Sequence, residues 1–106
     1  TGNYQTAVVG KWHLGEGKEH QPTGFDFWSV LPGQGEYFDP YMIEMGKTIE
    51  VPGYATDIIT EKSLNWMKTR NPEKPFFLMC LHKAPHREWE PHPKNRGLYQ
   101  DDIAVP

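Results

Sequence analysis

Two short apolar runs, separated by an amphipathic segment, most strongly constrain what this 106-residue chain can fold into. Ala7-Val8-Val9 opens a strand expected at about residues 6–13, and Phe76-Phe77-Leu78-Met79-Cys80-Leu81 predicts a second strand at residues 75–81. Between them, apolar side chains recur at helical spacing over about residues 56–70. Because strand, helix and strand in this order favour parallel pairing, we expect an α/β fold with a parallel sheet.

The amphipathic segment predicts a helix that packs one face onto this sheet. Thr56 or Asp57 is the expected N-cap, and Asn71-Pro72 ends the helix because proline cannot continue it. The expected apolar stripe consists of Ala55, Ile59, Ser63, Trp66 and Met67, with Ile58 beside it.

The rest of the chain is expected to form loops and a small hairpin. Within residues 14–53, the aromatic cluster at residues 24–28 is interpreted as a lid that packs a long loop onto the domain. Apolar segments on either side of Gly46-Lys47 predict a hairpin with a two-residue turn, expected at the surface and outside the central sheet. Residues 82–106 are rich in proline and charge, so they are expected to leave the second strand as a loop.

Composition excludes two classes of partner. The formal net charge of −3 provides no basic field of the kind that nucleic-acid binding needs. No segment reaches the roughly 18 consecutive apolar residues of a membrane-spanning helix. The single cysteine, Cys80, excludes an intrachain disulfide and is expected to be a buried thiol within its strand.

A cation and an imidazole lie close together at the end of the first strand. If extended geometry continues to His13, then Lys11 and His13 point to the same side and Trp12 points the other way, into apolar packing. Gly10 and Gly15 allow a sharp turn or the close approach of a ligand. The carboxyl ends of strands are where ligands usually bind in open α/β sheets, so this edge is a candidate anion site.

The second strand is followed directly by His82-Lys83-Ala84-Pro85-His86, which is expected at the same edge of the sheet. The spacing of His82 and His86 would suit zinc on a helix, but Pro85 opposes a helix there, and no Cys, Asp or Glu lies at ligand spacing. Capping of the backbone or plain solvation remains an alternative for both histidines.

Three residues around these histidines have less specific expected roles. Lys83 and Arg87 are interpreted as solvated. Trp89 is either a platform for a sugar ring or an anchor for its loop.

These motifs resemble those of a known family. Gly2-x-Tyr4-x-Thr6-Ala7, followed by Gly10-Lys11-Trp12-His13-Leu14-Gly15, resembles the second signature of the sulfatases, formylglycine-dependent sulfate-ester hydrolases with an alkaline-phosphatase-like fold. The His-x-x-Pro-His turn with the following Arg87-Glu88-Trp89-Glu90-Pro91 is similar to carbohydrate sulfatases of the N-acetylglucosamine-6-sulfatase type.

The resemblance implies a role for each candidate residue. Lys11 would neutralise sulfate oxygens and touch the formylglycine hydrate, and His13 would be the base that releases sulfate. His86 would contact the sulfate and protonate the departing sugar oxygen, a task that suits an imidazole. His82 and Trp89 are the candidate substrate-binding residues.

The chain also departs from the family pattern. Cys80 is followed by Leu81-His82, so it is not the nucleophile of a Cys-x-Pro-Ser-Arg motif. The paired Asp and the Asp-Asn expected for calcium have no match, and Asp101-Asp102 lies in the wrong context. A further sulfate-binding lysine, expected downstream, is also missing.

Residues 1–106 are therefore expected to be an internal segment of a sulfatase catalytic domain, inactive alone, with the formylglycine and calcium ligands outside the segment. The implied partners are a sulfated carbohydrate and the remainder of the same domain, and the implied location is extracytoplasmic (periplasmic, secreted or lysosomal). The alternatives are a phosphodiesterase or phosphonate hydrolase of the same superfamily, or a noncatalytic glycan-binding module.

Overall fold

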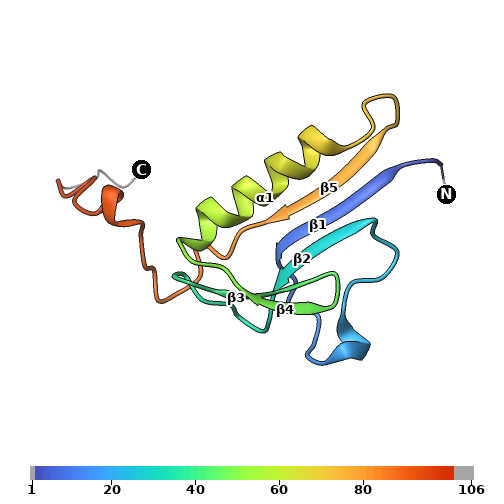
Figure 1. The fold of residues 1–106 in the computed structure, drawn as a ribbon. Coiled ribbons are helices and arrows are strands. Elements are labelled where there is room, and N and C mark those ends of the chain that lie inside the picture. Colours follow the sequence, from blue (N-terminus) through green and yellow to red (C-terminus); the bar gives the residue numbers. More distant parts are fainter. Residues whose placement is uncertain (1, 102–106) are drawn as a thin grey trace, which may run out of the picture.

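The computed structural model describes residues 2–101 and shows one mixed sheet with a helix against one face (Figure 1). The sheet has five strands in the order β4-β3-β2-β1-β5. The elements are β1 (Gln5–Lys11), a 3-10 turn (Lys18–His20), β2 (Phe27–Leu31), β3 (Tyr41–Glu44), β4 (Lys47–Glu50), α1 (Ala55–Thr69), β5 (Phe76–Leu81) and a second 3-10 turn (Pro93–Asn95).

Three neighbouring strands run parallel and end at one edge of the sheet. β1 pairs in parallel with β2 on one side and with β5 on the other. The register places Lys11 opposite Leu31 and Gly10 opposite Leu81, so the carboxyl ends of the three strands are level. The parallel α/β arrangement predicted from the two apolar runs is confirmed.

The core has two parts, one on each face of the sheet, because successive side chains of a strand point to opposite faces. The first lies between the sheet and α1 and contains Val9, Leu31, Met42, Ile58 and Ile59. The second lies on the other face and contains Val8, Trp28 and Val30, with Trp12 and Phe25 packed against it.

The interpretation of residues 24–28 as a lid is wrong, because Phe27 and Trp28 begin the buried strand β2. The hairpin expected at the surface also belongs to the sheet, since β3 pairs antiparallel with β2 and β4 pairs with β3. Its two-residue turn is Met45-Gly46, one residue earlier than the expected Gly46-Lys47, with φ values of 47° and 88°. Positive φ at both turn positions is the tight hairpin geometry that glycine favours.

The helix begins without the expected side-chain cap. Tyr54 is the N-cap, and neither Thr56 nor Asp57 caps the helix. The backbone N–H of Ala55 donates instead to the carbonyl oxygen of Tyr37 at 2.8 Å, which satisfies one of the free donors of the first turn. Tyr37 thereby joins the start of α1 to the loop between β2 and β3.

Cys80 was expected to be buried, but it is exposed. Within the described residues, β5 lies at the end of the strand order and pairs on one side only. A side chain on such a strand keeps more contact with solvent than one on the central β1.

Candidate functional site

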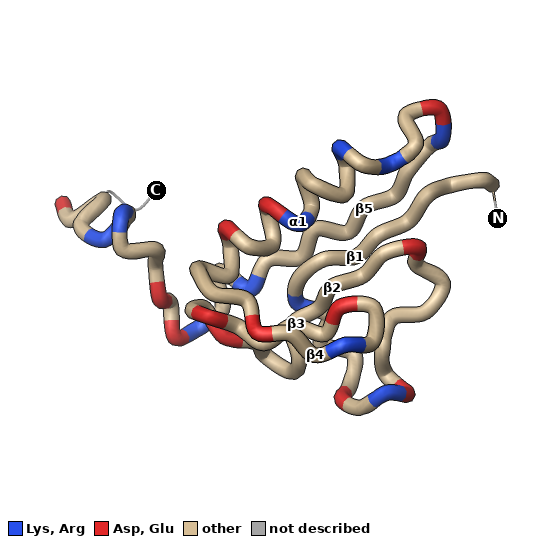
Figure 2. The backbone as a smooth tube through the Cα atoms, viewed as in Figure 1, with Lys and Arg blue, Asp and Glu red and all other residues tan. Residues whose placement is uncertain are grey.

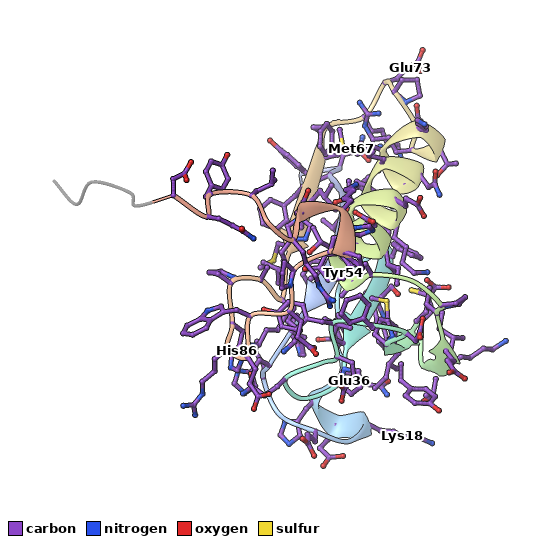
Figure 3. All side chains as sticks on the ribbon, turned by 90° about the vertical axis from the view of Figure 1, so that its left-hand side faces the viewer. Lys18, Glu36, Tyr54, Met67, Glu73 and His86 are labelled. Carbon is purple, nitrogen blue, oxygen red and sulfur yellow. The ribbon has the colours of Figure 1, made fainter. Side chains whose placement is uncertain are left out.

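The candidate site lies where the three parallel strands end. Lys11 is the last residue of β1, and His82 is the first residue after β5. Figure 2 shows basic residues where both strands reach this edge, and Figure 3 looks onto the same end of the molecule. The loop that follows β2 crosses the same edge and carries Gln34 and Tyr37.

The chain turns sharply after Lys11. β1 ends at Lys11, and His13 has a φ of 50° in the left-handed region. Extended geometry therefore does not continue to His13, and the alternation that would place Lys11 and His13 on one side does not apply. Trp12 does pack into apolar surroundings as expected, and its indole Nε1–H donates to the carbonyl oxygen of His20 at 2.8 Å.

Gly10 serves the packing of two strands. A Cβ atom at this position would lie 1.8 Å from the backbone oxygen of Leu81, and the residue has a φ of 114°. The close approach anticipated at Gly10 is thus made by the neighbouring strand β5. The absence of a side chain at Gly10 lets the ends of β1 and β5 lie next to each other.

His13 is exposed, and its ring is held from one side by Gln34. The side-chain Nε2 of Gln34 lies 2.9 Å from His13 Nε2. Gln34 was not identified from the sequence, because a glutamine in a loop of glycine and proline carries no signal of its own.

Lys83 was interpreted as solvated, and this is wrong. Its residue is only 8% exposed. The ammonium donates to the carbonyl oxygen of Gln34 at 3.0 Å and lies 4.7 Å from the centre of the Tyr37 ring. The lysine therefore points back against the loop between β2 and β3, and away from water.

Two tyrosines hold the segment that carries His86. The hydroxyl of Tyr37 donates to the carbonyl oxygen of His86, and the hydroxyl of Tyr54 donates to the carbonyl oxygen of Glu90 at 2.7 Å. Figure 3 labels Tyr54 and His86 on this side of the molecule. Burial raises the pKa of Tyr37, with smaller contributions from Tyr54 and Glu90, so the hydroxyl keeps its proton and remains a donor at neutral pH.

His86 is half-buried, and its own contacts orient the ring. Its backbone N–H donates to the carbonyl oxygen of Lys83 at 3.1 Å, and its Nδ1 donates to the carbonyl oxygen of Arg87. Because Nδ1 is engaged, Nε2 is the ring nitrogen that is left to contact a ligand.

His82 and Cys80 lie together beside the start of the same loop. His82 is exposed, and its Nε2 lies 3.7 Å from the sulfur of Cys80, which in turn lies 3.4 Å from the hydroxyl oxygen of Ser63 on α1.

Cavities adjoin the loops that carry His13 and His86. One, of about 310 Å³, is lined by Tyr37, Tyr54, Pro85, Trp89 and Pro91 among others, and Trp89 itself is 74% exposed. The other, of about 360 Å³, is lined by Trp12, His13, Glu16, His20 and Pro32 among others. A flat, exposed aromatic ring beside an apolar cavity suits contact with one face of a sugar.

The structure thus joins His13 to His86 through Gln34, Lys83 and Tyr37, and places Lys11 at the same edge. That Lys11, His13 and His86 surround one tetrahedral anion stays a prediction.

Over residues 2–101, the structure contains no group of three His, Cys, Asp or Glu residues that could hold a metal ion, so this segment does not by itself fit calcium. In the same range, no helix is long and apolar enough to cross a membrane.

Comparisons with known proteins agree with these motifs. A family model described as Sulfatase matches residues 2–103. N-acetylglucosamine-6-O-sulfatase of Bacteroides thetaiotaomicron is 50% identical over 103 residues, which cover 94% of this chain and 18% of that protein. Human N-acetylglucosamine-6-sulfatase is 29% identical, with 95% of this chain and 20% of that protein covered.

A solved structure also matches. A protein whose structure was solved in complex with its substrate D-glucosamine-2-N,6-O-disulfate superposes with a TM-score of 0.81 at 51% identity, covering 88% of this chain and 19% of that one. The chain therefore spans about a fifth of the length of the relatives that it matches.

Proposed function

Because this chain belongs to the sulfatase family, with the alkaline-phosphatase-like α/β fold, we propose that the protein containing it hydrolyses sulfate monoesters on a carbohydrate. The observation that carries the proposal is the level register of β1, β2 and β5, which brings Lys11 and the loop with His86 to one edge of the sheet. The 50% identity to an N-acetylglucosamine-6-O-sulfatase favours a 6-sulfated N-acetylglucosamine as the substrate.

The chemistry of sulfate esters explains why these residue types suit the task. A sulfate monoester carries negative charge on its nonbridging oxygens, and charge gathers on the bridging oxygen as the ester bond breaks. In our proposal, the ammonium of Lys11 neutralises the nonbridging oxygens. His86, held through Nδ1 by the carbonyl of Arg87, presents Nε2 to protonate the departing sugar oxygen. His13 accepts the proton that must be removed for sulfate to leave.

Other parts of the proposed enzyme lie outside this segment. Family membership suggests formylglycine and calcium in general terms: the first would supply a nucleophile and the second would neutralise charge on the sulfate, and we place the residues that would hold them outside this segment. The described residues contain neither a Cys-x-Pro-Ser-Arg motif nor a metal cluster.

We propose that His82 and the exposed Trp89 contact the sugar of the substrate. The extracytoplasmic location implied by the motifs is part of the same proposal.

The decisive experiment measures product release by the full-length protein. We expect sulfate release from N-acetylglucosamine 6-sulfate, and little or no phosphate release from the matching 6-phosphate or from a phosphodiester. Faster turnover of the phosphate esters would instead assign the protein to phosphate-ester chemistry. Glycan binding without any release would favour a binding module.

The 106-residue chain alone is the matched control. It lacks the nucleophile motif, so no turnover is expected from it. Sulfate release by the isolated chain would overturn the assignment of the nucleophile to another part of the protein.

A further inference from the structure

Lys83 is a buried cation that the proposed reaction does not use. Its residue is 8% exposed, whereas lysine is almost never buried unless it is paired. Removing an ammonium from water is costly unless hydrogen bonds compensate. Here the compensation comes from the carbonyl oxygen of Gln34, at 3.0 Å, and from the face of the Tyr37 ring, at 4.7 Å from its centre.

Each partner of Lys83 also contacts one of the two candidate histidines. Gln34 reaches His13, with 2.9 Å between the amide nitrogen and His13 Nε2. Tyr37 reaches His86, because its hydroxyl donates to the carbonyl oxygen of that residue. The carbonyl oxygen of Lys83 itself accepts from the backbone N–H of His86 at 3.1 Å. Lys83 therefore lies at the centre of the contacts that connect His13 and His86.

We infer that Lys83, Gln34 and Tyr37 are positioning residues that hold His13 and His86 in a fixed arrangement for acid–base work on a sulfate ester. This inference rests on the proposed function. None of the three needs to touch the substrate: Lys83 fixes the two loops to each other, Gln34 orients His13, and Tyr37 fixes the backbone of His86.

The side chain of Gln34 suits a base that gains and loses a proton. Its amide donates to a neutral imidazole nitrogen, and after rotation its oxygen accepts from a protonated one. Glu16 and His20 share a cavity wall with His13, and Lys11 precedes it by two residues at the end of β1. The ammonium of Lys83 contacts the backbone oxygen of Gln34 at 3.0 Å.

The first test is kinetic and uses Lys83→Met in the full-length protein, which keeps the length of the side chain and removes the charge. We expect kcat to fall by roughly 10- to 100-fold, with KM changing much less, because misplaced reacting groups slow the chemical step. Lys83→Arg retains the charge and should recover part of kcat. Lys94→Met, at an exposed lysine in the same C-terminal segment, is the matched control and should leave kcat unchanged.

Two kinetic outcomes would overturn the inference. One is a Lys83→Met enzyme with the wild-type kcat. The other is a loss of kcat that merely follows a loss of folded protein, as measured by circular dichroism and thermal melting. A wild-type protein that releases no sulfate at all would instead refute the proposed function.

The second test does not require activity. The full-length protein is labelled with ¹⁵N-histidine, and nitrogen spectra report on the His13 ring. The signals of His13 are those that disappear in His13→Gln. Gln34→Glu and Gln34→Leu should both change the nitrogen signals of His13, because the amide that contacts its Nε2 is replaced. Lys83→Met should alter the signals of both His13 and His86. Spectra unchanged in Gln34→Glu and Lys83→Met would show that neither residue orients the histidines.

Discussion

The two strands that carry the site, β1 and β5, look equally apolar in the sequence but have opposite surroundings. Val8 and Val9 of β1 are fully buried, one on each face of the sheet, while Phe76 and Phe77 of β5 are 38% and 52% exposed. Lys11 therefore extends from a strand fixed on both sides. Within residues 2–101, β5 pairs on one side, and the loop with His86 is held by contacts with the loops that carry Tyr37 and Tyr54. Two runs that look alike in the sequence therefore differ in the contacts that this segment gives them.

The largest effect is expected where the two strands touch. In Gly10→Ala, the new Cβ would meet the backbone oxygen of Leu81 at 1.8 Å, so β1 and β5 would have to separate. We expect a loss of about 3 to 5 kcal/mol in the free energy of unfolding, measured by denaturant titration of the full-length protein.

Gly24→Ala is the control for this substitution. Gly24 also has a positive φ, 79°, but nothing lies within 4 Å of the added atom. A loss of only about 1 kcal/mol is expected there, from the backbone conformation alone. Equal losses in the two variants would show that contact between β1 and β5 is not the constraint.

The second prediction tests the loop at the end of β5. In the full-length enzyme, His86→Ala should lower kcat by roughly 100-fold or more, because a general acid for the leaving oxygen is lost. His82→Ala, at the base of the same loop, should raise KM and leave kcat nearly unchanged. An unaltered kcat in His86→Ala would remove this residue from the mechanism.

A smaller effect is expected from the tyrosines that hold this loop. Tyr37→Phe removes the donor to the carbonyl of His86 and should cost about 1 kcal/mol of stability, with a several-fold lower kcat. Tyr54→Phe removes the donor to Glu90 instead, next to Trp89, and should act mainly on KM for the sugar. The same change in kcat for both variants would mean that the loop moves as a whole and that the hydrogen bonds of Tyr37 and Tyr54 do not have separate effects.

The smallest effect is the pH dependence of the Tyr37 tether. The pKa of this hydroxyl is raised above the ordinary value of 10.0 by burial, so its stabilising contribution is complete below pH 10 and is lost as the pH rises through the raised pKa. Tyrosinate absorbance of the wild type minus Tyr37→Phe should show a component that appears only above pH 10. A component that appears below pH 10 would contradict the burial of this hydroxyl.

The sequence predicted the parts of the fold that arise from local patterns. The two apolar runs and the helical stripe were sufficient for a parallel α/β sheet, and the family motifs directed attention to Lys11 and the edge where it lies. β2 was missed because it includes a buried serine, Ser29, and because its first two residues belong to the aromatic cluster at residues 24–28.

The contacts that hold the histidines could not be read from local patterns. Tyr37 and His86 are 49 positions apart, as are Lys83 and Gln34, and Tyr54 and Glu90 are 36 apart. Lys83 stands in a polar, proline-containing segment that is typical of a solvated loop, and only the folded chain shows that its ammonium turns inward. Side chains that act across such distances carry no periodic signal.

Gln34 uses different atoms toward its two neighbours: its amide faces His13, whereas its main-chain oxygen receives the ammonium of Lys83. Every amino acid supplies that oxygen, so the bond between the loops survives most replacements at position 34. The side chain at position 34 can therefore be replaced in a way that changes the contact with His13 and keeps the contact with Lys83. A library of replacements at this one position should therefore retune the acid–base behaviour of a single imidazole while the surrounding architecture stays intact.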